Sequence, residues 1–255
     1  MNLSKFYLKH VLAMFLIVNF TFFSFDALSI SNDDQQNIPQ SVEVAKKKNP
    51  GDLPYAFFYK SQGRLLEYMP VEPRTIDFSN RISFNGLGKQ ERDDYFPSNW
   101  GVAIVSDSVD VVVPMTRGGY FVLPDLPQAR QENAKLLFNT TSQKGSLKTA
   151  WILRYRDNTL SYTDFARSFD EVKQIQEKIK WYELKFKDEK KSSFDSLKAC
   201  FLEAGGDILL DDVPAKTSKL GRCVRLEFAP ELVKSNPRLK FVGALEIVTL
   251  ANTKE

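Results

Sequence analysis

The first 29 residues carry the feature that most constrains this chain, because they have the three zones of a secretory signal peptide. Two lysines lead into an apolar run over residues 11–25, whose 15 residues are interrupted by only three polar side chains. That length is typical of a signal peptide and falls short of the roughly 20 residues that span a bilayer. Ala27 and Ser29 then place small side chains two apart, as signal peptidase requires. We therefore expect cleavage after Ser29 and a mature chain that begins at Ile30.

Export would place the mature protein outside the cytosol, either in a periplasm or in the extracellular medium. An uncleaved membrane anchor is the alternative, which the short apolar run disfavours. The run is not followed by the cysteine that carries the lipid of a bacterial lipoprotein, and no later segment approaches membrane length. We expect a soluble mature chain with no stable membrane span after signal removal.

The charge of the chain gives no indication of a nucleic-acid partner. It has 35 Lys and Arg and 32 Asp and Glu residues, a formal net charge of +3. Nucleic-acid binding requires a clustered basic face that displaces counterions. The lysines here form short runs such as 46–48, or are mixed with acids as in 187–191. We predict that the protein does not bind nucleic acid.

Cys200 and Cys223 are the only cysteines in the chain, and export makes them informative. An oxidising compartment allows such a pair to form a disulfide, and two buried thiols are the alternative. The bond would close a loop with 22 residues between the cysteines. Such a loop closure stabilises a fold by roughly 3 kcal/mol. Because catalytic redox pairs usually lie close in sequence, as in Cys-x-x-Cys, we predict a structural disulfide.

Composition divides the mature chain into three parts. Residues 30–52 are polar and cannot bury enough apolar area to offset the entropy of ordering, which predicts a flexible polar leader. Residues 53–157 consist of short apolar runs separated by Gly, Pro and Asn, which predicts a β-rich domain. Residues 158–255 mix helical and strand periodicity, which predicts an α+β domain packed on the first.

Three hairpins are predicted within the β-rich part, each from two strand-length apolar runs that flank a turn sequence. They would pair residues 55–59 with 65–69, 109–113 with 120–123, and 134–138 with 147–155. Successive hairpins favour an antiparallel sandwich or an open barrel. The predicted fold class is therefore α+β, with an antiparallel β-rich N-terminal half followed by a C-terminal half of two helices and a β-sheet.

The apolar spacing changes from two to 3.6 after residue 158. Apolar side chains recur every three or four positions from Phe165 to Ile179, which places them on one face of a helix. Ser161 and Asp164 form the Ser-x-x-Asp start signal of such a helix. We predict a helix that begins near Thr163.

A second helix is predicted over residues 193–204, where it would end at a pair of glycines. Strands are predicted near residues 182–186, 207–210, 222–228 and 240–250. In the strand over 222–228, Val224 and Leu226 share one face and Cys223 points to the other. The disulfide would then clip the second helix onto that other face.

Residues 109–126 locally resemble a hairpin of carboxypeptidase-regulatory-like sandwiches. The resemblance covers fewer than 20 of the 255 residues. Those modules continue with a glycine and an aromatic strand, whereas residues 128–132 here are Gln, Ala, Arg, Gln and Glu. No family is assigned from it.

The residue inventory excludes several catalytic chemistries. His10 is the only histidine, and it would leave with the signal peptide. Without an imidazole the mature chain cannot form a Ser-His-Asp or Cys-His site, nor a zinc site based on histidine. It also lacks the Ser-x-x-Lys spacing of serine–lysine enzymes and a glycine-rich phosphate loop. We predict no catalytic residue, no cofactor and no metal site.

Pairs of carboxylates are the catalytic option that remains, because Asp and Glu alone can cleave glycosidic bonds. The candidate pairs are Asp93 with Asp94, Asp107 with Asp110, and Asp211 with Asp212. Acids this close together in loops are commonly turn formers or solvated surface. A carboxylate-dependent hydrolase acting on glycans is therefore kept as an alternative function.

The segment 85–101 is the candidate binding loop, since long loops on sheets often carry function. Its candidate ligand-binding residues are Asp93, Asp94, Tyr95, Phe96, Asn99 and Trp100. Aromatic faces beside acids and amides suit sugar rings or peptide segments, and the alternative is that the aromatic side chains plug one end of the core. Asn139 begins an Asn-x-Thr glycosylation acceptor in a predicted turn.

These observations together predict a non-catalytic, disulfide-linked exported protein that acts as a binding or envelope-associated accessory module. Its partner would be a small-molecule, glycan or protein ligand. The alternatives are the glycan hydrolase and a structural subunit of a secreted assembly, which would show an exposed apolar patch or an unpaired sheet edge.

Overall fold

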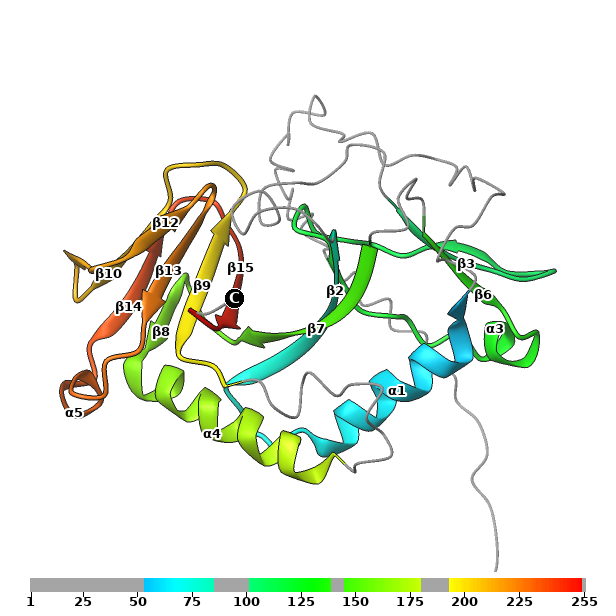
Figure 1. Cartoon of the computed structure of the whole chain (residues 1–255), viewed down its shortest axis with the longest axis horizontal. Coiled ribbons are helices and arrows are strands. Elements are labelled where there is room, and N and C mark those ends of the chain that lie inside the picture. The colour runs from blue at the N-terminus through cyan, green and yellow to red at the C-terminus, as the bar shows by residue number, and fades with distance from the viewer. Residues whose placement is uncertain (1–52, 85–100, 139–144, 180–192, 254–255) are drawn as a thin grey trace, which may run out of the picture. The chain divides into compact units, whose positions relative to one another are not determined.

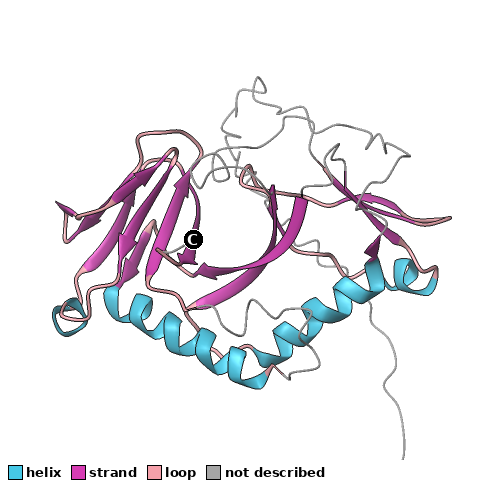
Figure 2. Ribbon diagram, in the orientation of Figure 1, coloured by secondary structure: helices cyan, strands magenta, loops and turns pink. Residues whose placement is uncertain are grey.

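The computed structural model describes residues 53–84, 101–138, 145–179 and 193–253. Strands predominate over helices in this part of the chain, and every pair of neighbouring strands is antiparallel (Figures 1 and 2). The predicted α+β class with sandwich-like antiparallel sheets is therefore confirmed. The helices are α1 (Tyr55–Tyr68), α3 (Pro127–Gln131), α4 (Tyr162–Lys178) and α5 (Leu232–Ser235).

The predicted hairpin over residues 55–69 is wrong, because this segment forms α1. Its buried side chains Tyr55, Gln62 and Leu65, and that of the C-cap residue Met69, follow one another at intervals of seven, three and four, which is a helical spacing. The strand propensity of the aromatic residues is thus outweighed by the packing of one helical face on the core, because tertiary packing supplies most of the stability of a helix. Gln62 Nε2 donates a hydrogen bond to Leu123 O (2.8 Å), and Gln62 Oε1 accepts one from Leu123 N (2.9 Å). These two bonds attach α1 to the chain just after β5.

The helix predicted near Thr163 is confirmed as α4. Ser161 is its N-cap and accepts a hydrogen bond from Asp164 N at 3.0 Å. The buried carboxylate of Glu171 in α4 accepts from Thr75 N (2.8 Å) and from its hydroxyl (2.9 Å). The helix is therefore attached to the chain just before β2, and Figure 1 shows α1 and α4 running along the same side of the sheets.

The strands of the described residues form three sheets. The large sheet has the order β12-β13-β9-β15-β7-β2-β5. Its strands are β12 (Ser218–Leu220), β13 (Cys223–Glu227), β9 (Ser196–Phe201), β15 (Leu245–Ala251), β7 (Gly145–Leu153), β2 (Ile76–Phe84) and β5 (Tyr120–Phe121). In this sheet β7, which precedes residue 158, pairs with β15, which follows it. The predicted domain boundary at that residue stays a prediction.

The remaining described strands form two smaller sheets. The N-terminal sheet has the order β1-β6-β3-β4, with β1 (Leu53–Pro54), β6 (Lys135–Phe138), β3 (Val102–Val105) and β4 (Asp110–Val112). The C-terminal sheet has the order β11-β10-β14-β8, with β11 (Val213–Pro214), β10 (Asp207–Leu210), β14 (Arg238–Val242) and β8 (Thr159–Ser161).

The other two predicted hairpins contain real strands but pair them wrongly. Strand β4 pairs with β3, and β5 pairs with β2 instead of β4. Likewise β6 pairs with β1 and β3, whereas β7 pairs with β2 and β15. The apolar runs predicted the strands, but partners distant in sequence determined the pairing.

The helix predicted over residues 193–204 is wrong, because β9 occupies this segment. Every residue of β9 is buried, so both faces of the strand are covered. Strands β10 and β13 confirm the predictions at 207–210 and 222–228. The long strand predicted at 240–250 is two strands, β14 and β15, and the strand predicted at 182–186 lies outside the described residues.

The large sheet has two faces of different character. Its first face carries the main core, where Leu197, Val224 and Val248 pack with Leu239 and other side chains of the C-terminal sheet and α4. The same face carries a second core under the N-terminal sheet, α1 and α3. The second face carries a small cluster of Tyr120, Cys200, Cys223 and Ile247. Polar and charged side chains occupy much of the rest of this second face.

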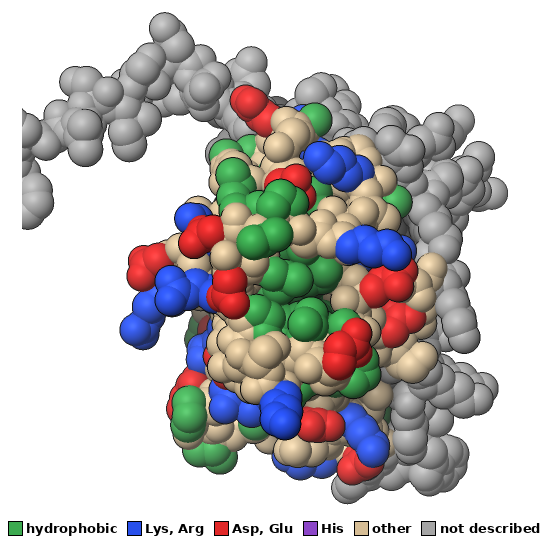
Figure 3. Space-filling model, turned by 90° about the vertical axis from the view of Figure 1, so that its left-hand side faces the viewer, with side chains coloured by type: hydrophobic (Ala, Val, Ile, Leu, Met, Phe, Trp, Pro, Cys, Tyr) green, Lys and Arg blue, Asp and Glu red, His purple; other side chains and the backbone are tan. Residues whose placement is uncertain are grey.

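Figure 3 shows hydrophobic side chains gathered on one outer face of the molecule, with acidic and basic groups around them. Val213 of β11 and Val242 of β14, in the C-terminal sheet, are 64% and 43% exposed. An exposed apolar surface is what the assembly-subunit alternative predicts. Among the described helices, none combines the length and the apolar character needed to cross a membrane.

Candidate functional site

The residues of the predicted binding loop lie outside the described part of the chain. Asp93, Asp94, Tyr95, Phe96, Asn99 and Trp100 all fall in the segment 85–100, so their role stays a prediction. Strand β2 of the large sheet ends at Phe84 and β3 of the N-terminal sheet begins at Val102, so the segment connects two different sheets. Asn139 also lies outside the described residues.

Of the described carboxylate pairs, three members lie in turns and the fourth, Asp110, begins strand β4. Asp107 lies in a turn closed by a hydrogen bond from Ser106 N to Val109 O (2.8 Å). Asp211 and Asp212 both have positive φ, the conformation of a two-residue hairpin turn, between β10 and β11. Asp211 accepts from Arg238 N (2.8 Å), and Asp212 accepts from Lys240 Nζ (2.8 Å). Their carboxylates therefore hold the turn to β14.

Cys200 and Cys223 form the predicted disulfide, and the described residues contain no free cysteine. The two cysteines are directly opposite each other on β9 and β13. At the next position along the two strands, Phe201 N donates a hydrogen bond to Arg222 O (3.2 Å). Hydrogen-bonded and non-hydrogen-bonded pairs alternate along an antiparallel ladder, so the cysteines form a non-hydrogen-bonded pair, in which side chains approach most closely. Cys223 is on the face predicted for it, but the bond joins two neighbouring strands rather than a helix and a strand.

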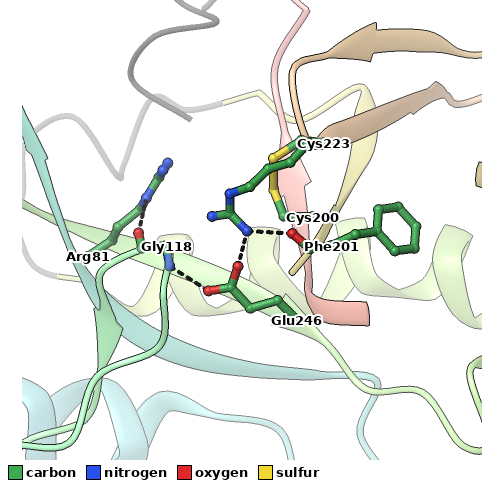
Figure 4. The surroundings of a disulfide bond; sticks show 7 residues. Arg81, Gly118, Cys200, Phe201, Cys223 and Glu246 are labelled. Carbon is green, nitrogen blue, oxygen red and sulfur yellow. Dashed lines mark hydrogen bonds and ion pairs between the residues drawn. A yellow bond between two sulfur atoms is a disulfide. The ribbon is translucent and has the colours of Figure 1, made fainter. Parts of the chain in front are cut away.

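A buried ion pair lies beside the disulfide. The side chains of Arg222 and Glu246 are 5% and 3% exposed and form a salt bridge. Arg222 Nη1 also donates to Phe201 O at 2.7 Å. Figure 4 shows the Glu246 carboxylate between the guanidinium and the backbone N–H of Gly118, which donates to its other oxygen. The buried Glu246 carboxylate therefore has a hydrogen-bond donor on each side.

At Gly118 the β5 edge of the large sheet lies against the strands near its opposite edge. A Cβ at this position would lie 2.7 Å from the Tyr120 ring and 3.0 Å from Arg222, so only glycine permits this close approach. Arg81 Nε donates to Gly118 O (3.2 Å), and its guanidinium lies 4.8 Å from the centre of the Tyr120 ring. Tyr120 belongs to β5 at one edge, yet it packs with the cysteines of β9 and β13. The second face is therefore curled.

Two pairs of like charges face each other across strands on this second face. Arg81 of β2 is directly opposite Lys148 of β7. Lys198 of β9 is directly opposite Arg225 of β13. Lys198 is only 8% exposed, and Arg225 is half-buried. Directly opposed like charges destabilise a sheet unless other groups compensate them.

Asp195 compensates part of the charge of Arg225. Its carboxylate accepts hydrogen bonds from Thr253 N (2.8 Å) and Ser196 Oγ (3.1 Å). Burial acts to raise the pKa of Asp195, but the hydrogen bonds and the charge of Arg225 outweigh it, so the pKa lies below its ordinary value. Among the described residues, no hydrogen-bond partner is present for the buried Nε of Arg225.

Hydroxyl side chains flank the Lys198–Arg225 pair on both sides. Thr249 of β15 is directly opposite Lys198, and Ser218 of β12 is directly opposite Arg225. Four adjacent strands thus place Ser218, Arg225, Lys198 and Thr249 in one line across the second face, which we call the donor row. Each of its side chains carries donor hydrogens, and two carry a positive charge. Such a set can hold an anionic group.

Comparison with family models, curated proteins and solved structures gives no match for this chain. The described residues also contain no cluster of three or more His, Cys, Asp or Glu side chains that could hold a metal ion. The donor row is therefore the candidate site that the geometry itself provides.

Sequence reasoning missed the donor row because residues 193–204 were predicted as a helix. A strand signal was nonetheless present: Ser196, Lys198 and Cys200 alternate with Leu197, Ala199 and Phe201. With that alternation, Lys198 would have fallen on the same face as the cysteine. The opposition of Cys200 and Cys223 then sets the register that brings Lys198 against Arg225.

Proposed function

We propose that the protein is an exported, non-catalytic binding or envelope-associated accessory module that holds its ligand on the second face of the large sheet. One observation carries this proposal: that face places buried or half-buried cations directly opposite each other, at Lys198 and Arg225. A surface that served folding alone would bury apolar side chains there, because charge is costly to bury. Cations kept in this arrangement are typical of a surface that meets an anionic partner.

The proposal that the protein acts outside the cytosol rests on two observations. The sequence begins with the zones of a signal peptide. The structure contains a disulfide between its two cysteines, which is the state that an oxidising compartment favours. N-terminal sequencing of the native protein is the test. The expected first residue is Ile30, and a sequence beginning at Met1 in protein recovered from a reducing compartment would reject export.

Binding is favoured over glycan hydrolysis by the roles of the described acids. Asp211 and Asp212 hold a turn to β14, and Asp107 lies in an exposed turn. Glu246 is in a buried ion pair. Glycosidases instead direct two carboxyl groups at one bond from opposite sides, roughly 5 to 9.5 Å apart.

A thermal-unfolding screen of the oxidised protein tests the proposed function. The panel contains a chito-oligosaccharide, a peptidoglycan fragment, an acidic peptide and glycerol phosphate. We expect at least one of them to raise the Tm of the wild type, and we expect Lys198→Met to abolish that rise. Lys173→Met is the matched control, because it removes the same charge from an exposed position on α4.

Variants of the predicted loop separate the two candidate locations. If the second face holds the ligand, Tyr95→Ala and Trp100→Ala leave the rise in Tm unchanged. If those two variants abolish the rise and Lys198→Met retains it, the ligand binds the loop and the proposed location is rejected.

A further inference from the structure

Strand β4 forms one edge of the N-terminal sheet. It pairs with β3 on one side, and no strand of the described residues pairs with it on the other. The backbone N–H and C=O groups of such an edge can form hydrogen bonds with a further strand. An unpaired sheet edge is also what the assembly-subunit alternative predicts.

Two hydrogen bonds, one at each end of the β3–β4 ladder, determine how the backbone groups of these strands point. Val113 N donates to Val102 O, and Ser106 N donates to Val109 O, both at 2.8 Å. Along an antiparallel ladder, hydrogen-bonded pairs alternate with non-hydrogen-bonded pairs, whose backbone groups point away from the partner strand. Counting inward from either end gives the same assignment for every pair between them.

This assignment places Asp110 and Val112 in non-hydrogen-bonded pairs with β3, whereas Val111 is in a hydrogen-bonded pair. The N–H and C=O groups of Asp110 and Val112 therefore point to the outer side of β4. Their side chains share one face of the strand, where Asp110 is exposed and Val112 is 36% exposed. An antiparallel segment beside β4 would exchange hydrogen bonds with both residues.

The other described edge strands are protected against the addition of a strand. Strands β1 and β11 contain Pro54 and Pro214, and β12 contains Lys219, which are residues that block an edge. Both residues of β5 are only 3% exposed. Beside β8, Thr159 exchanges hydrogen bonds with Arg156, so part of that edge is already paired. Strand β4 contains neither proline nor lysine.

The charge around β4 selects the kind of segment that fits this edge. Asp107 lies in the turn that precedes the strand, and Glu132 accepts a hydrogen bond from Ser108 of the same turn at 2.6 Å. Lys135 lies in the same row as Asp110 but two strands away, at roughly 10 Å. Salt screens exposed charges at that separation. A basic side chain directly opposite Asp110 would therefore be attracted to this end of the strand.

We propose that the β4 edge binds an extended segment of a partner protein, which adds an antiparallel strand to the N-terminal sheet. The segment places a basic side chain opposite Asp110 and an apolar one opposite Val112. A second copy of this chain would instead bring the same carboxylates to the edge. The edge belongs to a different sheet from the proposed ligand site, so the inference goes beyond that site and does not depend on it.

Hydrogen exchange followed by NMR tests the edge itself. In the free oxidised protein the amides of Asp110 and Val112 should exchange fast. Those of Val111 and Val113 should exchange slowly, because they donate to β3. Slow exchange at Asp110 and Val112 in the monomeric protein would show that the edge is already covered, and it would overturn the proposal.

Synthetic peptides at millimolar concentration test the partner chemistry. The probe is an extended threonine-rich peptide with Val-Thr-Lys at its centre, so that antiparallel pairing places its valine opposite Val112 and its lysine opposite Asp110. We expect it to slow exchange at both amides. The peptide N-methylated at that valine and lysine should not bind, and the peptide with glutamate in place of lysine should bind about fivefold more weakly. No effect of the lysine peptide, or equal binding of its N-methylated form, would overturn the proposal.

Variants of the protein locate the binding. Asp110→Lys should reverse the preference, so that the glutamate peptide binds more tightly than the lysine peptide. Asp170→Lys makes the same change at an exposed position of α4 and should keep the wild-type preference. Val112→Pro removes an outward N–H but no hydrogen bond to β3, so it should abolish peptide binding with little change in Tm. Wild-type binding of the lysine peptide by both Asp110→Lys and Val112→Pro would place the peptide elsewhere and overturn the proposal.

Sedimentation velocity of the peptide-free protein tests a second copy as the occupant. We expect no dimer that depends on this edge. A concentration-dependent dimer of the wild type that Val112→Pro abolishes would assign the edge to self-association, and the proposed partner would be wrong.

Discussion

Cys200 and Cys223 lie directly opposite each other on two neighbouring strands, β9 and β13, so their disulfide joins backbones that already share a hydrogen-bonded ladder. Both cysteines are buried, at 1% and 0% exposure, and Tyr120 from the far edge of the same sheet packs against them. The bond therefore fixes the register of the two strands that carry Lys198 and Arg225. Stability and the candidate site depend on the same pair of strands.

Loss of the disulfide should destabilise the protein by about 3 kcal/mol, because the unfolded chain regains the freedom of a loop with 22 residues between the cysteines. Urea unfolding of the wild type and of the C200A/C223A variant measures the difference. Intact-mass analysis provides an independent check, in which the native protein takes up alkylating reagent only after reduction. Alkylation of both sulfurs without reduction would show that the disulfide is absent.

Removing one partner of the Arg222–Glu246 pair should be strongly destabilising. Both side chains are at most 5% exposed, so Glu246→Gln leaves a buried guanidinium without its counter-charge, at a cost of about 3 to 5 kcal/mol. Asp212→Asn, which breaks the exposed pair with Lys240, is the control and should change stability little. Chemical denaturation compares the two, and equal small effects would mean that the buried pair does not contribute as inferred.

The N-cap of α4 should contribute measurably to stability. Ser161 accepts from Asp164 N and donates to its carboxylate at 2.7 Å, so Ser161→Ala removes both hydrogen bonds. The expected loss is about 1 kcal/mol. Ser235→Ala removes an exposed serine hydroxyl from α5 and should stay within about 0.5 kcal/mol of the wild type. A loss of helical circular dichroism at lower denaturant in Ser161→Ala alone is the expected result.

Glu132 should make the protein more sensitive to acid. Hydrogen bonds from Ser108, Ser106 and Gln128 lower its pKa from 4.5 to about 2. Because the folded pKa lies below the unfolded one, this carboxylate stabilises the fold above about pH 4.5, and the contribution is lost as the pH falls toward 2. The Tm difference between wild type and Glu132→Gln should therefore be constant near neutral pH and shrink between pH 4.5 and 2.

The matched control for that measurement is Glu177→Gln, which removes an exposed carboxylate from α4. Its Tm difference from the wild type should not follow the same acid profile. A difference for Glu132→Gln that stays constant down to pH 2 would contradict the hydrogen-bonded carboxylate seen in the structure.

The parts of the fold that sequence predicted correctly are those with a strong local signal. The Ser161–Asp164 start and the apolar spacing that follows identified α4, and alternation in Val224, Leu226 and Cys223 identified the faces of β13. Both signals arise within a few residues of each other, so no knowledge of distant partners was needed.

The errors arose where distant partners determine the structure. Segment 55–68 has strand-forming aromatic residues, but it forms a helix whose buried Gln62 is hydrogen-bonded to Leu123, a partner 61 residues away. Strand β9 is covered on both faces, so its spacing also fits a helix. The candidate site depends on the register of four strands, which the sequence pattern alone could not supply.

The central claim is that the second face of the large sheet, where Lys198 lies opposite Arg225, holds the ligand. The ligand-induced rise in Tm of Lys198→Met, compared with that of Lys173→Met, tests it most directly. We predict that Lys198→Met loses the rise seen in the wild type and that Lys173→Met retains it. A rise in Lys198→Met equal to that of the wild type would contradict the claim.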